Sequence, residues 1–337
     1  MSSAGPGVAR RKYIPASAAI LIAMARVDFA ALTEPHRAEL LAYCYRMLGS
    51  VHEAEDLVQE TMLRAWQARE RYDERRASIR TWLYRIATNA CLTALEGKAR
   101  RPLPSGLGAP STAPGAPLRP AFEVPWLQPF PDARLGDPAD QAVRRDSMRL
   151  ALIAAMQTLP PRQRAVWVLR EVLAFRAAEV AGLLNTSVAS VNSALQRARA
   201  GLSVAALEDV APSGDPAARR TVEAYVRAFE AADVDALVEL LTHDAVLEMP
   251  PVPLWYRGRD DYAAFIRRVF AMRGVGWRMV PTGANGQPAV AAYAPDPAGG
   301  HRLHTLQVFT VAGGRISRTV VFQDPAVFAA FDLPTAV

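Results

Sequence analysis

The chain has 337 residues, of which 51% are hydrophobic and 21% charged, with a formal net charge of +6. This length predicts two or three compact units, and the hydrophobic content excludes a chain that cannot build packed cores. The positive charge suits a polyanionic partner, although by itself it does not separate nucleic acid from an acidic protein surface.

The N-terminal residues 1–27 are expected to form a loosely ordered extension. Within them, Ala18–Ala25 is apolar and follows three basic residues, as in a secretory signal. It is short, polar sequence follows at once, and no later stretch approaches the length of a membrane span. The two cysteines, Cys44 and Cys91, both lie in helical patterns, which argues against a disulfide framework or a cysteine metal site. We therefore expect a cytoplasmic protein without a membrane partner.

Residues 28–97 form the first predicted unit, and it is helical. Apolar residues recur at helical spacing up to Leu48, Gly49-Ser50 stops that helix, and an acidic turn containing Glu53 opens the next. A third helix is predicted from about Ser78 to Leu95.

One face of that third helix carries Trp82, Arg85 and Asn89 at i, i+3 and i+7. An aromatic ring, a cation and an amide in line suit unstacked bases, because the ring stacks, the cation holds phosphate and the amide reads a base edge. The alternative is that Trp82 belongs to the core, as a tryptophan in such a pattern more often does.

Residues 98–139 are predicted to be a linker, because ten of the chain's 26 prolines lie between Arg101 and Asp140. The patch from Pro125 to Asp132 is either a docking turn or part of the path along a partner.

The second unit, residues 140–207, contains a predicted helix-turn-helix. A short helix over Ala177–Leu184 is followed by a three-residue turn and by a helix that ends at about Leu202, with Ser187 as its N-cap. Val188, Val191, Leu195 and Ala198 make its apolar face. The polar side chains lie largely off that face, and they are Ser187, Ser190, Asn192, Ser193, Gln196, Arg197 and Arg199. No acidic residue interrupts them, so phosphate and base-edge contacts are favoured over an ordinary solvated helix.

After a second linker at residues 208–216, the third unit spans residues 217–337. Helices are predicted at Arg219–Ala231, Asp233–Leu241 and Asp260–Ala271. The predicted strands are Ala245–Met249, Gly276–Val280, Ala289–Tyr293, Leu303–Val311 and Ile316–Phe322. Helices followed by a curved antiparallel sheet indicate an α+β cone.

The runs Asp56-Leu-Val-Gln-Glu-Thr and Thr81-Trp-Leu-Tyr-Arg-Ile-Ala-Thr-Asn resemble region 2 of sigma-70-type initiation factors, and Leu159–Leu202 resembles region 4. No separate region 3 lies between them, so the resemblance is to the small extracytoplasmic-function (ECF) sigma factors. It implies binding to RNA polymerase core and recognition of promoter -10 and -35 elements.

By this resemblance, Asp56, Gln59, Glu60 and Arg64 correspond to polymerase-binding positions. The same resemblance assigns Trp82, Arg85 and Asn89 to the melted -10 element, with Asn89 beside a flipped base. It assigns the polar face of the helix that ends at Leu202 to the -35 element.

The third unit resembles SnoaL-like domains of the nuclear transport factor 2 superfamily. This resemblance implies a regulatory appendage beside or in place of an anti-sigma factor, which remains a candidate partner. Some SnoaL-like relatives are isomerases or cyclases, and the candidate acid-base residues here are Asp244, Glu248, His243, His301 and His304. No spacing pairs an acid with a base. Trp255, Tyr256, Trp277 and Phe322 are interpreted as cone core, with the lining of an apolar-ligand pocket as the alternative.

The sequence thus predicts a multidomain protein with two all-α sigma domains and an α+β cone. The predicted function is that of a sigma factor regulated by its C-terminal domain, and neither enzymatic activity nor a cofactor or metal is expected. The alternative is a SnoaL-type isomerase, cyclase or ligand-binding module with an attached DNA-binding segment.

Overall fold

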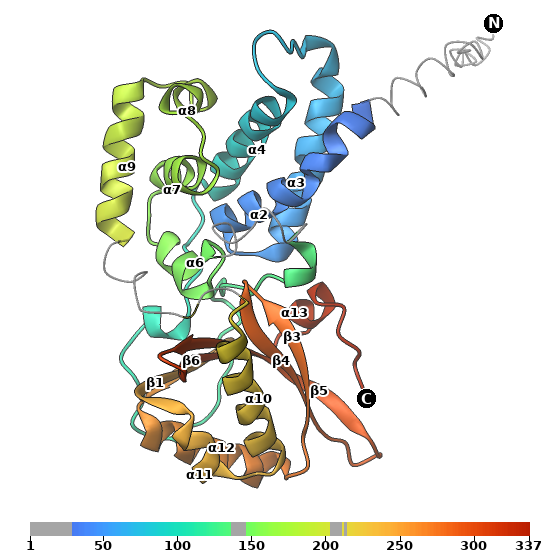
Figure 1. Ribbon diagram of the computed structural model, residues 1–337, viewed down its shortest axis with the longest axis vertical. Helices are drawn as coiled ribbons and strands as arrows, with labels where there is room; N and C mark the ends of the chain where they lie inside the picture. Colours follow the sequence, from blue (N-terminus) through green and yellow to red (C-terminus); the bar gives the residue numbers. More distant parts are fainter. Residues whose placement is uncertain (1–28, 136–145, 203–210, 212–213) are drawn as a thin grey trace, which may run out of the picture.

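The computed structural model describes residues 29–135, 146–202, 211 and 214–337. The N-terminal extension with its Ala18–Ala25 run lies outside these residues. Figure 1 shows two lobes, a helical lobe above and an α+β lobe below, which meet along one face of a sheet. The predicted fold class, two all-α units followed by an α+β domain, is confirmed.

The helical lobe contains the three helices predicted for the first unit and four from the second. They are α2 (Arg37–Leu48), α3 (Val51–Ala68), α4 (Ile79–Leu95), α6 (Leu150–Met156), α7 (Pro161–Trp167), α8 (Ala177–Leu183) and α9 (Val188–Leu202). A π-helical turn, Val168–Val172, extends α7. Helix α6 was not anticipated as a separate helix.

Local chemistry sets the ends of the first-unit helices. Gly49 ends α2 at a φ of 69°, and a Cβ there would lie 2.7 Å from a methyl of Leu127. Only glycine meets both demands without strain. Ser50 and Ser78 then cap α3 and α4 by accepting hydrogen bonds from the backbone N–H of the third residue of each helix.

Within the described residues, the α+β lobe is built on one six-stranded sheet in the order β2-β1-β6-β5-β4-β3. The strands are β1 (Leu241–Met249), β2 (Val252–Arg257), β3 (Arg278–Ala284), β4 (Gln287–Pro295), β5 (His301–Ala312) and β6 (Arg315–Phe322). Only β1 and β6 pair in parallel; the other neighbours are antiparallel. The helices are α10 (Pro216–Glu230), α11 (Val234–Glu239), α12 (Arg259–Arg273) and α13 (Pro325–Ala330).

Two of these elements, β2 and α13, were not predicted from the sequence. Strand β2 contains Pro253 and follows Pro250-Pro251, a composition that signals a loop. It forms nonetheless because β2 is an edge strand that pairs only with β1, and an edge strand tolerates a residue without an N–H. Helix α13 starts at a proline and is capped by the Asp324 carboxylate, which accepts from the Ala326 N–H at 2.9 Å.

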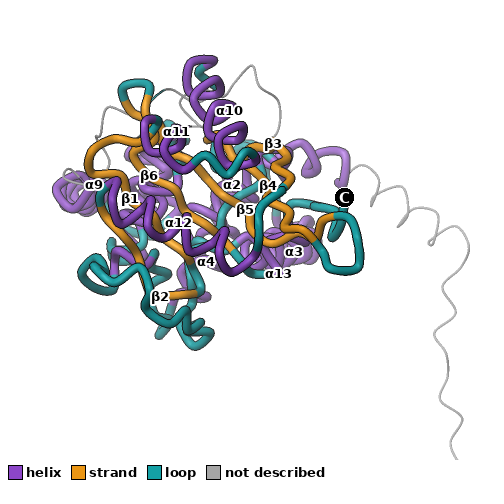
Figure 2. The backbone as a smooth tube through the Cα atoms, turned by 90° about the horizontal axis from the view of Figure 1, so that it is seen from below, coloured by secondary structure: helices purple, strands orange, loops and turns teal. Residues whose placement is uncertain are grey.

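The sheet buries both of its faces. Helices α10, α11 and α12 cover one face, as Figure 2 shows from below, and enclose a core that includes Tyr256, Trp277 and Phe309. The opposite face contributes Leu306, Val308, Val320, Phe322 and others to the core of the helical lobe. The two lobes therefore share a hydrophobic core, and burying it is the main force that holds them together.

This arrangement corrects the interpretation of two aromatic residues. Tyr256 and Trp277 belong to the cone core as expected. Phe322 instead packs on the face toward the helical lobe. Trp255 points its indole N–H to the Gly108 carbonyl at 3.0 Å. Neither position is visible from strand periodicity alone, because both faces of the sheet are apolar.

The proline-rich segment lacks long regular elements, as predicted, but its described part lies on the α+β lobe. The Ser111 N–H donates to the Trp255 carbonyl at 2.8 Å, and the Ala121 N–H donates to Pro251 at 2.9 Å. The Arg268 guanidinium donates to two carbonyls of the segment, each at 2.6 Å. The middle of the segment from Arg101 to Leu135 is therefore fixed to the C-terminal domain, whereas its two ends also bond the first unit, where Arg101 pairs with Glu53 and Arg134 with Glu55.

His304 on β5 is held in its neutral form. Its ring packs edge-on against Trp277 at 5.5 Å between centroids. Burial, with a smaller contribution from the charge of Arg273, lowers the pKa of His304 to about 4. The lowered pKa means that the unfolded chain binds a proton more readily than the folded chain.

We predict that His304 makes the protein less stable in mild acid. Because its folded pKa lies below its unfolded value, stability is full above about pH 6.5 and falls as the pH drops toward 4. The ring is partly solvated, so the expected loss is only about 1 kcal/mol. Urea unfolding at pH 7 and pH 5 should show a smaller acid-induced loss for His304→Gln than for the unmodified chain. An equal loss in both would contradict this assignment.

Candidate nucleic-acid interface

Helix α9 is packed by one face and exposed on the other. Val191, Leu195 and Ala198 are buried, as predicted, whereas Val188, in the first turn of the helix, is 43% exposed. The Ser190 N–H donates to the Ser187 hydroxyl at 3.1 Å, which confirms Ser187 as the cap. Asn185 takes a φ of 48° and makes the turn before it.

The polar residues assigned to this helix by sequence all lie on its exposed side: Ser187, Ser190, Asn192, Ser193, Gln196, Arg197 and Arg199. Arg199 pairs with Glu171 at 2.8 Å. Arg197 forms no ion pair with any residue that the structure describes. The face thus presents hydroxyls, amides and a free guanidinium, a set that suits a DNA groove.

The three residues predicted on α4 do line up, but they differ in exposure. Arg85 and Asn89 are exposed. Trp82 is half-buried, with its ring against Tyr72 at 5.2 Å and Phe29 at 6.3 Å between centroids. Its ring therefore belongs partly to an aromatic cluster. The Arg85 guanidinium donates to the Gly182 carbonyl of α8 at 3.2 Å, so the second helical unit touches this face.

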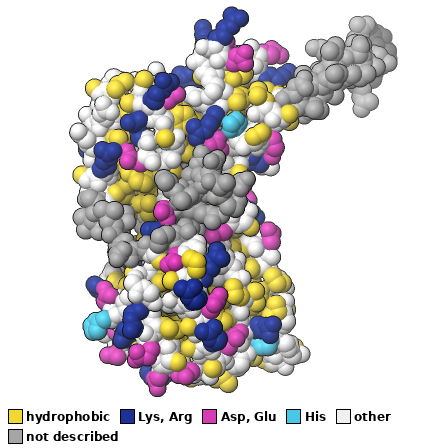
Figure 3. Space-filling view, in the orientation of Figure 1, with side chains coloured by type: hydrophobic (Ala, Val, Ile, Leu, Met, Phe, Trp, Pro, Cys, Tyr) yellow, Lys and Arg dark blue, Asp and Glu magenta, His cyan; other side chains and the backbone are white. Residues whose placement is uncertain are grey.

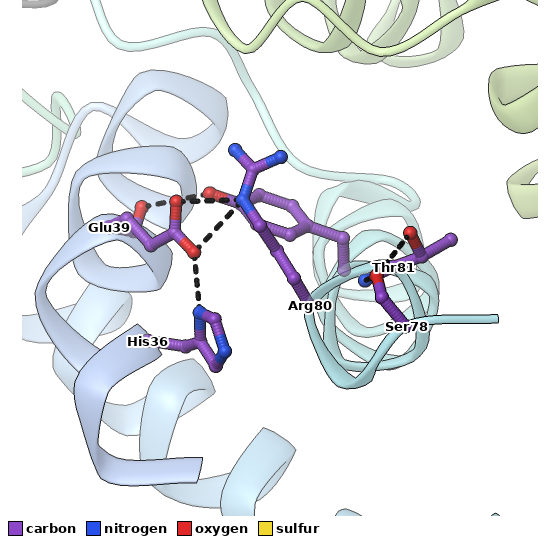
Figure 4. Close-up of polar contacts among 6 residues, drawn as sticks. His36, Glu39, Ser78, Arg80 and Thr81 are labelled. Atoms are coloured by element: carbon purple, nitrogen blue, oxygen red, sulfur yellow. Dashed lines mark hydrogen bonds and ion pairs between the residues drawn. The ribbon is translucent and has the colours of Figure 1, made fainter. Parts of the chain in front are cut away.

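A charged cluster fixes the start of α4, as Figure 4 shows. Arg80 donates to both carboxylate oxygens of Glu39 on α2, at 3.1 and 3.0 Å, and His36 contacts the same carboxylate at 2.8 Å. The Arg80 guanidinium also lies over the ring of Phe175, 4.7 Å from its centroid. Since Phe175 precedes α8, this arginine joins the two helical units.

Helix α3 presents the residues expected to bind polymerase. Asp56 and Gln59 are exposed, and Glu60 pairs with Arg64 at 2.6 Å. The same face carries Leu63, which is 56% exposed. Sequence reasoning missed Leu63, although its spacing of four and seven from Gln59 and Asp56 was the available signal.

The tightest link between the lobes is the turn between β3 and β4. Asn285 and Gly286 take φ values of 58° and 70°, as a two-residue hairpin turn requires. The Asn285 side chain accepts from the Phe130 N–H at 2.8 Å and donates to the Tyr45 hydroxyl at 2.9 Å and the Met148 carbonyl at 2.7 Å. One amide thus holds the first unit, the proline-rich segment and the second unit.

The neighbours of Asn285 extend this junction. The Gly286 N–H donates to Asp132 at 2.7 Å. The side chain of Gln287 accepts from the Leu150 N–H at 2.8 Å and donates to the Phe309 carbonyl at 3.0 Å. We call residues 285–287 the junction turn. The Asn-Gly pair between two strands was a visible hairpin signal, but its partners are distant in sequence.

A buried arginine makes a further link between the helical units. Arg164 of α7 donates to the Met47 carbonyl of α2, to the side chain of Gln157 and to two more carbonyls in its own unit. It is 3% exposed, and burial lowers the pKa of its guanidinium to about 10. Hydrogen bonds to carbonyls offset part of the cost of burying this charge.

The acid-base candidates do not form a catalytic group in the cone. Glu248 is fully buried, but it accepts from Arg318 at 2.7 Å and from the Ser105 N–H at 2.8 Å, so it ties β1 to the proline-rich segment. Asp244 and His243 are exposed. His301 contacts the Gly276 carbonyl at 2.9 Å.

The cone interior carries a different polar set. The Tyr262 hydroxyl donates to Thr319 at 2.9 Å and lies 3.2 Å from the Tyr225 hydroxyl. Burial raises the pKa of Tyr262 to about 12, so the phenol remains protonated.

Among the described residues, no helix is long and apolar enough to cross a membrane.

Comparison with protein families matches three stretches of the chain. Residues 32–101 match sigma-70 region 2, residues 149–202 match sigma-70 region 4, and residues 222–319 match the SnoaL-like domain. The order and positions agree with the resemblances drawn from the sequence.

The curated relatives include the ECF RNA polymerase sigma factor SigG of Mycobacterium tuberculosis. It is 49% identical over 321 residues, which cover 93% of this chain and 85% of SigG. SigJ of the same organism is 30% identical over 254 residues, with 72% and 73% covered. The crystal structure of SigJ superposes with a TM-score of 0.62 at 24% identity and covers 91% of this chain and 99% of SigJ, so the two share a fold.

The helix-turn-helix, the region 2 helices and the C-terminal α+β domain thus occur together in relatives of nearly the same extent. The prediction of a sigma factor is confirmed. The chain belongs to the extracytoplasmic-function RNA polymerase sigma factors and serves in promoter recognition and transcription initiation, with a SnoaL-like domain at its C-terminus.

Proposed function

We propose that this sigma factor is kept in a closed, promoter-incompetent arrangement by its own SnoaL-like domain. The observation that supports this proposal is the junction turn, in which the Asn285 side chain bonds at once to Tyr45 of region 2 and to Met148, the residue directly before region 4. In this arrangement, the domain acts as an attached inhibitor, and a separate anti-sigma factor would be an additional control. The protein would work in the cytoplasm, beside RNA polymerase.

The polymerase-binding surface stays open in the closed arrangement. Asp56, Gln59 and Leu63 are exposed on α3. Among the described residues, the hydrogen bond between the C-terminal domain and α3 lies at the start of this helix, where His52 contacts the Ala326 carbonyl at 3.1 Å. Polymerase core can therefore reach α3 before the lobes separate.

The two surfaces expected to bind the promoter lie close together, too close to bind the -10 and -35 elements at the same time. The -10 and -35 elements are named for positions about 25 base pairs apart, or about 85 Å of duplex at about 3.4 Å per base pair. Here α8 contacts both α4 and α9. With helix diameters of about 10 Å, the axes of α4 and α9 lie within about 20 Å. Both elements are out of simultaneous reach until region 4 leaves region 2.

Once the regions separate, each surface has a distinct task. Helix α9 would anchor the -35 duplex through Arg197 and its exposed hydroxyls and amides. Helix α4 would hold the opened -10 strand, with Asn89 at the edge of an extruded base and Arg85 on phosphate. On the face that Figure 3 shows, basic side chains are interspersed with acidic ones over both lobes.

Leu63→Asp is expected to weaken binding to polymerase core. An apolar side chain buried at an interface contributes about 1.5–3 kcal/mol, which corresponds to roughly a tenfold to hundredfold loss of affinity. Fluorescence anisotropy with labelled protein and core polymerase measures it. Met272→Asp on α12, an apolar position of similar exposure (48% against 56% for Leu63), serves as the matched control. Equal affinities for the two variants would contradict the assignment of α3.

Asn89→Ala is expected to impair promoter opening more than duplex binding. The amide acts only when a base has left the stack, so permanganate reactivity of the -10 region should fall while gel-shift affinity for a closed duplex changes little. Arg197→Ala should show the reverse order, because it contacts duplex phosphate. Equal losses in both assays for Asn89→Ala would count against its role.

Asn285→Gly is expected to release the closed arrangement. Glycine takes the positive φ without strain, so the hairpin survives while three buried hydrogen bonds, about 1 kcal/mol each, are lost. At limiting concentrations, holoenzyme should form at least several-fold more open promoter complex, and small-angle scattering of the free factor should show a larger radius of gyration.

Asp332→Gly is the matched control for this experiment, because Asp332 also has a left-handed φ, of 51°, and is exposed. It should change neither measurement. Unchanged opening and unchanged dimensions for Asn285→Gly would refute an inhibitory junction.

A further inference from the structure

Two adjoining cavities lie where region 2, region 4 and the SnoaL-like domain meet. The smaller, of about 230 Å³, is lined by Arg100 and Arg101 after α4, by Arg318 of β6 and by the turn between α6 and α7. The larger, of about 440 Å³, shares both arginines and that turn, and Lys98 and Pro160 border it as well. Segments from all three parts of the chain therefore enclose one space outside the cone.

Ion pairs balance only part of the charge around this space. Lys98 and Arg101 both contact one carboxylate oxygen of Glu53, each at 3.0 Å. Arg318 pairs with the buried carboxylate of Glu248 at 2.7 Å. The lining of the smaller cavity itself contains three guanidiniums and no carboxylate.

Arg100 adds a charge that no carboxylate balances among the described residues. Its exposed guanidinium donates to the Gly106 carbonyl at 2.8 Å. Four cations then stand against two carboxylates, and the buried Arg164 at the edge of the larger cavity adds to the excess. A phosphoryl group carries a charge of about −1.5 to −2 at pH 7 and three acceptor oxygens. It therefore matches this excess better than a carboxylate, and guanidiniums bind it through paired hydrogen bonds.

A buried amide in the shared turn has a donor without a partner. Gln157 is 4% exposed and lines both cavities. Its Oε1 accepts from the Arg164 guanidinium at 2.7 Å, which fixes the orientation of the amide because a guanidinium only donates. Its Nε2 then has no hydrogen-bond partner among the described residues. A buried donor in this state is unfavourable, and an anion in the cavity supplies the missing acceptor.

We propose that these cavities bind the phosphoryl group of a small phosphorylated molecule. The phosphoryl oxygens accept from Arg100, Arg101 and the Gln157 amide, and the rest of the molecule extends into the larger cavity. Because Arg318 borders the same site, the anion links the SnoaL-like domain to both sigma regions. Binding therefore favours the closed arrangement, and by reciprocity the closed arrangement strengthens binding. This last part rests on the proposed function.

Calorimetric titration of the full-length protein with inorganic phosphate, pyrophosphate and acetate at constant ionic strength tests the site. We expect saturable binding of one equivalent of phosphate or pyrophosphate and none of acetate. Tighter binding of pyrophosphate supports a ligand larger than one phosphoryl group, and the reverse order supports free phosphate. Arg100→Gln should weaken the tighter of the two at least fivefold. Arg119→Gln, an exposed arginine of the same proline-rich segment that lines neither cavity, should not change it.

Gln157→Glu tests the interior of the site. The new carboxylate still accepts from Arg164, so the fold is preserved, but it replaces the free donor by a charged acceptor and should weaken binding at least tenfold. Near-ultraviolet circular dichroism checks the fold, and Arg100→Gln tests the site by itself if Gln157→Glu does not fold. Unchanged affinity in the folded variants would overturn the proposal, as would an equal loss in Arg119→Gln. Displacement of the bound anion by one equivalent of non-promoter duplex would also overturn it, by assigning these arginines to the DNA backbone.

The link to the closed arrangement is tested separately with Asn285→Gly. A threefold or greater loss of affinity for the anion is expected, because Arg318 moves away with the SnoaL-like domain when the lobes separate. Unchanged affinity would overturn the coupling and leave the site itself supported by Arg100→Gln and Gln157→Glu. Failure of the closed state would appear instead in promoter opening and scattering, which need no added anion.

Discussion

Within the apolar core that joins the two lobes, one buried side-chain amide fixes how three segments of this sigma factor meet. Asn285 bonds three chain segments that are far apart in sequence, through Tyr45, Phe130 and Met148. Each partner is itself buried, so removing the amide leaves polar groups without a partner in a region that excludes water, which costs more than a surface hydrogen bond contributes. The position of each segment thereby depends on the other two, and the three separate together.

The proline-rich segment connects region 2 to the junction turn. Its prolines have fixed φ angles and no N–H donor, so no regular element forms, and its polar groups bond to neighbouring segments: to the C-terminal domain at Trp255 and Glu248, and to the first unit at Gly49 and Glu53. It carries the chain from region 2 along one face of the sheet and returns it to the junction turn at Phe130. A flexible linker of the same length would leave the lobes free to move apart.

Local structure was readable from the sequence, and long-range structure was not. Helices α3, α4 and α9 follow from caps and apolar periodicity within a few residues, and their exposed faces were correctly placed. The exposure of Leu63 and the partial burial of Trp82 depend on neighbours from other segments, such as Phe29. Strand β2 was hidden by prolines that only an edge position tolerates. The Asn285-Gly286 turn was recognisable as a hairpin, but no residue near it in the sequence indicates that its side chain bonds to Tyr45 and Met148.

In the proposed closed arrangement, the polymerase-binding face of α3 is accessible, whereas the promoter-binding faces of α4 and α9 are too close together to act. This difference limits the possible mechanisms of activation. A partner that binds both arrangements equally well shifts nothing, however tightly it binds. In the proposed closed arrangement, Asp56, Gln59 and Leu63 are as accessible as in an open one, so contacts to them would recruit the factor without opening it. The free energy that separates the lobes would then come from contacts made only in the open form. We propose that the side of α4 under Gly182, where Arg85 would be released, and the proline-rich segment supply these contacts. Promoter and polymerase would then act jointly, and neither alone would suffice.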